Sequence, residues 1–107
     1  MDLAAQYLSK QGVTIIDKNY HFSRYAEIDL IGRENNETVF IEVKTRGGLG
    51  FGSPEDAVTP AKQDKIRQAA ESYILFHPQL GGNFRFDVVA INFDESGQPQ
   101  IKHWRNI

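Results

Sequence analysis

The chain has 107 residues, of which 40% are hydrophobic and 24% are charged, and this predicts one globular domain over residues 1–107. The absence of cysteine excludes a disulfide framework and a thiolate zinc site. A formal net charge of −2 gives no global field that attracts nucleic acid, so any such binding must come from a local basic patch. No apolar run approaches the roughly 18–20 residues of a membrane span, and we expect a cytoplasmic protein with no membrane partner.

The N-terminal part predicts a helix followed by extended chain. Apolar residues recur at helical spacing between Asp2 and Lys10, and Gly12 is well placed to end this helix. The periodic pattern begins directly after the first two residues, so the helix is expected to start without a cap. Residues 13–22 are strand-like on either side of a break at residues 17–19.

Two short runs of branched apolar residues carry acids where a buried strand should have none. They are residues 26–31 (AEIDLI) and residues 40–44 (FIEVK). Acidic residues are disfavoured in strands, and an unpaired buried carboxylate is costly. A divalent metal ion is the simplest candidate for the compensating charge.

The segment between these runs predicts a hairpin. Asn tolerates a positive φ angle, so Asn35-Asn36 suits a two-residue turn. In that register Asp29 lies opposite Glu42, and Glu27 lies opposite Lys44. Directly opposed residues have Cβ atoms roughly 4.5–5.5 Å apart, and two carboxylates at that range repel unless one is protonated or a cation lies between them. A different turn would make the opposition diagonal.

The second half of the chain predicts a helix between two strands. A glycine-rich loop is expected at residues 45–54, followed by a helix from Thr59-Pro60 to His77. Residues 84–91 read as an interior strand and residues 100–105 as an edge strand. The strands flanking the helix can be parallel, with the helix as a right-handed crossover. The fold class is therefore α/β, with a mixed β-sheet flanked by helices.

The acidic strands suggest a specific chemistry. Asp29 and Glu42 can hold one or two Mg²⁺ or Mn²⁺ ions, which prefer oxygen ligands, and the carbonyl oxygen of Val43 could add a ligand. Lys44 projects on the same side as Glu42, about 7 Å along the strand. There it could position or deprotonate an attacking water, or neutralise charge on a phosphate. Metal activation of water with charge stabilisation is what phosphodiester hydrolysis requires.

A basic surface could accompany this site. Arg46 follows the second acidic strand closely, and Lys62, Lys65 and Arg67 cluster at the start of the long helix. Together they could contact nucleic-acid phosphates. The plainer interpretation is that charges on an outer helix face are a solvated surface.

Structural interpretations also exist for the acids. Asp29 and Glu42 could simply be ion-pair partners of nearby Lys and Arg side chains. Glu27 could support a metal site or pair with Lys44. Arg85 and Asp87 share a strand face, and we expect them to pair with each other or a neighbour. The three histidines have no spacing typical of a metal site and are interpreted as structural.

The order of these motifs is specific. Asp29, twelve intervening residues and then Glu42-Val43-Lys44 on a hairpin resemble the core of the PD-(D/E)xK nuclease superfamily. The fuller set of motifs resembles the bacterial YraN-type family of uncharacterised proteins, which is similar to archaeal Holliday-junction resolvases. That set is EIDLI at 27–31, VFIEVKTR at 39–46, FGSPEDAV at 51–58, Lys62 and RFDVV at 85–89.

The resemblance covers nearly the whole chain and implies a restriction-endonuclease-like fold with Asp29, Glu42 and Lys44 in the metal-binding and catalytic positions. It implies a Mg²⁺-dependent endonuclease acting on DNA, with branched, Holliday-junction-like DNA as a substrate class and a homodimer as a suitable assembly. Glu27 and Asp87 match motif residues without an assigned role.

The alternative is a nucleic-acid-binding or adaptor module that keeps this fold without cutting. The chain departs from the family at Ala26, which replaces the usual glycine, and at the glutamate of an N-terminal GxxxE segment, which has no counterpart. The missing glutamate and the acidic overall balance favour the binding module. The intact Asp29, Glu42 and Lys44 favour the enzyme.

Overall fold

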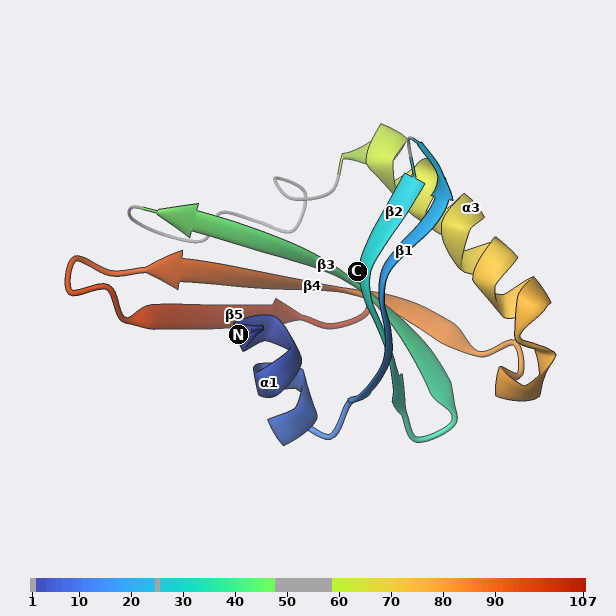
Figure 1. Ribbon diagram of the computed structural model, residues 1–107, viewed down its shortest axis with the longest axis horizontal. Helices are drawn as coiled ribbons and strands as arrows, with labels where there is room; N and C mark the ends of the chain where they lie inside the picture. Colours follow the sequence, from blue (N-terminus) through green and yellow to red (C-terminus); the bar gives the residue numbers. More distant parts are fainter. Residues whose placement is uncertain (1, 25, 48–58) are drawn as a thin grey trace.

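The computed structural model describes residues 2–24, 26–47 and 59–107, which form a five-stranded mixed sheet with one helix on each face (Figure 1). In chain order the elements are α1 (Leu3–Lys10), β1 (Thr14–Ser23), β2 (Ala26–Glu34), β3 (Glu37–Gly47), α3 (Pro60–Phe76), the short 3₁₀ helix η1 (Pro78–Leu80), β4 (Phe84–Phe93) and β5 (Pro99–Trp104). In space the strand order is β1-β2-β3-β4-β5. The expected α/β class is confirmed. Neither α-helix of the described part is long and apolar enough to cross a membrane.

The two central strands run parallel, as expected for strands joined through a helix. β3 pairs with β4 in parallel, whereas the β1–β2, β2–β3 and β4–β5 pairs are antiparallel. β5 is an edge strand, which confirms the expectation for the C-terminal segment.

Each face of the sheet buries its own apolar cluster. The cluster under α3 consists of Ala26, Ile28, Ile31, Phe40, Ile66, Ala69, Ala70, Tyr73 and Val88. The cluster under α1 consists of Ala4, Leu8, Val13, Leu30, Val39, Ile41, Val89 and Ile91. Consecutive residues of the central strands alternate between the clusters, since side chains along a strand point to opposite faces. The interpretation of β4 as an interior strand is therefore confirmed.

The hairpin register is confirmed where the β2–β3 ladder forms. The paired residues run from Leu30 opposite Ile41 to Glu34 opposite Glu37, which places Asn35-Asn36 at the turn. Asn35 adopts a φ of 56°, the left-handed conformation that Asn tolerates.

The start of α3 also agrees with the prediction. Thr59 caps the helix, because its Oγ1 accepts a hydrogen bond from the N–H of Lys62 at 3.3 Å, and Pro60 is the first helical residue. The helix ends at Phe76, directly before His77.

Two predictions for the N-terminal part were wrong. α1 does have a cap, because Asp2 is itself the N-cap and its Oδ1 accepts a hydrogen bond from the N–H of Ala5 at 3.0 Å. The expected break at residues 17–19 does not interrupt the strand, since β1 keeps one register with β2 from Lys18 to Tyr20, although Asn19 adopts a φ of 52°. The pairing of β1 with β2 has register shifts on either side of this segment, between Ile15 and Asp17 and between His21 and Ser23.

The predicted glycine-rich loop does not begin at residue 45. Residues 45–47 continue β3, because each pairs with a residue of β4, from Thr45 opposite Ile91 to Gly47 opposite Phe93. The neighbouring strand supplies main-chain partners that local sequence does not reveal. Residues 48–54 of the predicted loop lie outside the described residues.

Candidate active site

Asp29 lies where β2 and β3 separate. The last ladder pair is Leu30 with Ile41, and the N–H of Val43 instead donates a hydrogen bond to Oδ2 of Asp29 at 2.8 Å. Ile28 packs in the cluster under α3, but Leu30 packs in the cluster under α1. Residues two apart in a regular strand share a face, so the regular alternation of side chains along β2 is interrupted at Asp29. The carboxylate therefore accepts the hydrogen bond of a main-chain N–H that the ladder leaves without a strand partner.

Glu42 faces α3. Its Oε1 forms an ion pair and hydrogen bond with Nζ of Lys62, and its side chain is only 10% exposed. Burial raises the pKa of Glu42 to about 7. The contact with Lys62 acts in the opposite direction, whereas the negative charge of Asp29 and a hydrogen bond with it raise the pKa further. Glu42 and Asp29 therefore lie close enough for the charge of one to affect the pKa of the other.

A hollow of about 230 Å³ opens between β2, β3 and α3 around these two carboxylates. It is lined by Arg24, Ala26, Glu27, Asp29, Glu42, Lys62, Lys65 and Ile66. Three acids and three cations thus share one hollow. Arg24 was not predicted from the sequence as a site residue, although its place just before the first acidic strand was a signal that could have marked it.

The remaining candidates lie around this hollow rather than in its lining. Lys44 lies in β3 opposite Ala90 of β4 and is not among the described lining residues. Val43 directs its N–H to Asp29, and its carbonyl faces the same neighbouring strand, since both main-chain groups of a strand residue point to one edge. Arg46 also lies in β3, but its side chain lies outside what the structure describes.

The expected opposition of Glu27 and Lys44 does not form. The β2–β3 ladder stops at Leu30, so it reaches neither this pair nor the pair of Asp29 and Glu42. Glu27 instead lies 3.8 Å from Nε2 of His21 on the adjacent strand. No ion pair within the described part of the chain joins Glu27 to Lys44.

The donor set has the chemistry of a small divalent-cation site. Asp29 and Glu42 offer carboxylate oxygens, which Mg²⁺ and Mn²⁺ prefer, and Mg²⁺ commonly binds one or two carboxylates and keeps several waters. In residues 2–24, 26–47 and 59–107, no group of three acidic or histidine side chains is arranged to hold a metal. A cation here would therefore take two side-chain ligands and complete its shell with the Val43 carbonyl and water. The raised pKa of Glu42 fits this interpretation, because a bound cation would stabilise the ionised carboxylate, which burial and, to a smaller extent, the charge of Asp29 disfavour.

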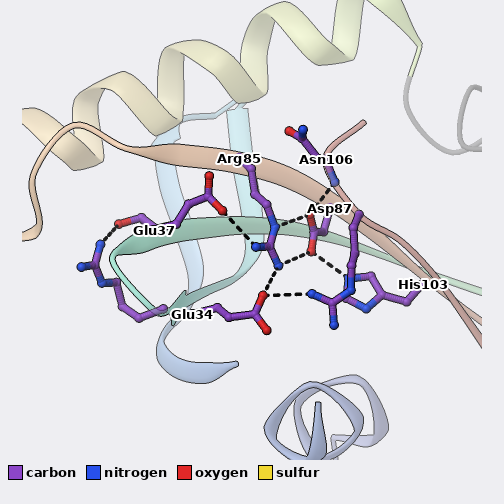
Figure 2. Close-up of polar contacts among 9 residues, drawn as sticks. Glu34, Glu37, Arg85, Asp87, His103 and Asn106 are labelled. Atoms are coloured by element: carbon purple, nitrogen blue, oxygen red, sulfur yellow. Dashed lines mark hydrogen bonds and ion pairs between the residues drawn. The ribbon is translucent and has the colours of Figure 1, made fainter. Parts of the chain in front are cut away.

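The motif residue Asp87 belongs to a separate charge network, shown in Figure 2. The expected pairing with Arg85 is confirmed, with Nε of Arg85 3.0 Å from Oδ1 of Asp87. Asp87 is only 1% exposed and also contacts Nε2 of His103 at 2.7 Å and the N–H of Asn106 at 2.9 Å. These bonds join β4 to β5 and to the C-terminal residues.

The same network holds the tip of the hairpin. Arg85 forms ion pairs with Glu34 at 2.7 Å and with Glu37 at 3.0 Å, and Arg105 contacts Glu34 at 2.9 Å (Figure 2). This arrangement assigns Asp87 a structural role, and it also supports the structural interpretation of His103.

A family model matches residues 2–91 and bears the description "Uncharacterised protein family UPF0102". The chain belongs to this family. The match includes every residue that lines the hollow as well as Asp87, and it ends before β5.

Individual UPF0102 relatives are similar along most of their length. A UPF0102 protein of Rhodococcus jostii (strain RHA1) is 50% identical over 105 residues, covering 98% of this chain and 88% of the relative. A UPF0102 protein of Syntrophomonas wolfei is 45% identical over 102 residues, covering 95% of this chain and 87% of the relative. A UPF0102 protein of Geobacter sulfurreducens is 43% identical over 105 residues, covering 98% and 81%.

Proposed function

We propose that this UPF0102 protein is a metal-dependent endonuclease with a restriction-endonuclease-like core that hydrolyses DNA phosphodiesters. The observation that supports this best is the hollow itself, in which Asp29 and Glu42 line the same space as Arg24, Lys62 and Lys65. Paired carboxylates suit a divalent cation, and cations around them suit the phosphates of a polyanion.

Within this proposal Asp29 and Glu42, with the carbonyl of Val43, hold Mg²⁺ or Mn²⁺. The bound ion supplies charge stabilisation and lowers the pKa of water, which is the chemistry that phosphodiester hydrolysis needs. The hydrogen bond from Val43 orients Asp29, and Lys44 assists the attacking water or the developing charge. Arg46, Lys62 and Lys65 contact the DNA backbone.

The choice of substrate follows the motif resemblance to PD-(D/E)xK nucleases and Holliday-junction resolvases. Branched DNA is therefore the first substrate to test, and a homodimer suits a two-fold branched junction. A global charge of −2 is consistent with a confined basic surface rather than with binding along a long stretch of duplex.

One observation favours the alternative of a nucleic-acid-binding module that does not cut. Lys62 of the chain itself supplies a counter-ion to Glu42. A site neutralised in this way could be retained for binding alone.

The deciding experiment measures Mg²⁺- and Mn²⁺-dependent cleavage of four-way junctions, flaps, single strands and duplexes. We expect Glu42→Gln and Asp29→Asn to lower cleavage by about 100-fold or more, the scale seen when one transition-state-stabilising group is removed. DNA affinity should stay unchanged or rise, because a negative charge is lost. Glu71→Gln, at an exposed position of α3, is the matched control and should cut like the wild type.

Each other result has a distinct meaning. Equal cleavage by Glu42→Gln would assign the activity to another site or to a contaminant. Metal-independent DNA binding without cleavage of any substrate would support the binding module.

A further inference from the structure

Lys62 and Glu42 come from different elements but meet inside the candidate site. Nζ of Lys62, in the first turn of α3, contacts Oε1 of Glu42 in β3. Glu42 is 10% exposed and Lys62 is 43% exposed, so the ammonium approaches a nearly buried carboxylate from the solvent side.

Residues before and after Lys62 in the chain fix its position at the start of α3. Its main-chain N–H is bound by the cap residue Thr59 at 3.3 Å, and Ile66, one turn further on, is buried against the sheet. The start of α3 is thereby anchored beside β3, while the lysine side chain keeps its four flexible carbons.

We propose that Lys62 is a tethered counter-ion of the candidate metal site, which a divalent cation must displace from Glu42 in order to bind. This inference rests on the proposed function, because it assigns Glu42 as a ligand. The ammonium and the metal ion repel each other, and both are attracted to the same carboxylate, so their binding is competitive. Lys62 is a positioning residue in this scheme, and its departure is feasible because its side chain is half exposed.

Competition between Lys62 and the metal ion predicts the sign of the change in metal affinity when Lys62 is removed. If Lys62 merely supported the local structure, its removal would weaken metal binding. If Lys62 is a competitor, its removal strengthens metal binding. The sign of the change therefore separates the two roles.

The test is calorimetric titration of the full chain with Mn²⁺ at constant ionic strength and at a constant pH above about 8, where Glu42 is ionised. We expect Lys62→Met to bind Mn²⁺ about fivefold more tightly than the wild type, the scale of one partly exposed ion pair. Lys62→Arg keeps the competing charge and should stay within about twofold of the wild type. Lys10→Met, in the exposed last turn of α1 on the other side of the sheet, controls for the change in net charge and should also remain near the wild-type value.

The outcomes distinguish this inference from the proposed metal site. Wild-type binding that is lost in Glu42→Gln but unchanged or weakened in Lys62→Met would overturn the inference and leave the metal site standing. An equal gain in Lys10→Met would also overturn it, because the effect would come from net charge. Binding that appears only in Lys62→Met and disappears in Lys62→Met/Glu42→Gln would support it. No Mn²⁺ binding by any variant would overturn both proposals.

Discussion

The carboxylate of Asp29 accepts a hydrogen bond from the N–H of Val43 at 2.8 Å, beyond the last ladder pair of the hairpin. One side chain therefore closes the end of the β2–β3 pairing and also contributes to the paired acids of the hollow. Stability and metal binding at Asp29 can be separated by choosing the substitution.

Asp29→Ala leaves the N–H of Val43 without its acceptor, whereas Asp29→Asn retains an acceptor oxygen. We expect Asp29→Ala to lower the free energy of unfolding by about 1–3 kcal/mol, the cost of an unsatisfied polar group, and Asp29→Asn to lower it by less. Both should lose Mn²⁺ binding. Urea unfolding with calorimetry measures the two effects, and an Asp29→Ala variant as stable as the wild type would contradict the role in closing the hairpin.

The pH dependence of Mn²⁺ affinity should reflect Glu42. Burial raises the pKa of Glu42 to about 7, and only the ionised carboxylate binds metal. Affinity should therefore fall by up to about tenfold per pH unit below 7 and level off above 8. Calorimetric titrations between pH 6 and 8.5 measure this, and an affinity that stays constant through this range would exclude Glu42 as a titrating ligand.

The buried network around Asp87 should be a major source of stability. Asp87→Ala removes the acceptor for Arg85, His103 and the N–H of Asn106 (Figure 2). We expect a loss of about 3–5 kcal/mol in the free energy of unfolding, because Nε of Arg85 and the N–H of Asn106 lose their buried acceptor, although Arg85 keeps its ion pairs with Glu34 and Glu37. Asp64→Ala, at an exposed position of α3, should cost less than about 0.5 kcal/mol. Similar losses of unfolding free energy in both variants would contradict a stabilising role for the buried network.

The same network predicts acid sensitivity. Burial opposes ionisation of Asp87, but the bonds from His103, Arg85 and Asn106 lower its pKa overall, and hydrogen bonding to Arg85 lowers the pKa of Glu34. The unfolded carboxyls bind protons at higher pH than the folded ones, so their contribution is complete above about pH 5 and is lost as the pH falls through the lowered folded values. Urea midpoints between pH 7 and 2 should fall steeply in the wild type. Asp87→Asn should show a shallower decline, and an identical decline would contradict this account.

Arg24 and Lys65, which line the hollow, should contribute to DNA affinity without sequence preference. We expect Lys65→Ala and Arg24→Ala each to weaken binding and to reduce the slope of log affinity against log salt by about 1. Lys10→Ala is the control and should leave both quantities unchanged. Fluorescence anisotropy over a salt series provides the measurement, and an unaltered slope would place the DNA elsewhere on the protein.

Two successful predictions depend on neighbours in the chain. The Asn35-Asn36 turn and the Thr59-Pro60 helix start are set by the φ preference of Asn, the capping hydroxyl of Thr and the fixed φ of Pro. The end of β3 was misplaced for the complementary reason. Its last residues are held by main-chain bonds to β4, about 46 residues later in the sequence, so no local signal marks them as strand.

The features of the candidate site also fall into those that local sequence determines and those that depend on tertiary contacts. The sequence alone determined the α/β class, the hairpin register and the presence of acids in strands that should be apolar, because these follow from residue type and from the period of two along a strand. Only the tertiary structure decided which charges meet: Lys62 with Glu42 across 20 residues, and Arg85 with Glu34 across 51. Pairing of this kind depends on how α3 and β4 pack beside the hairpin, and Coulomb attraction acts through distance in space, not through separation along the chain.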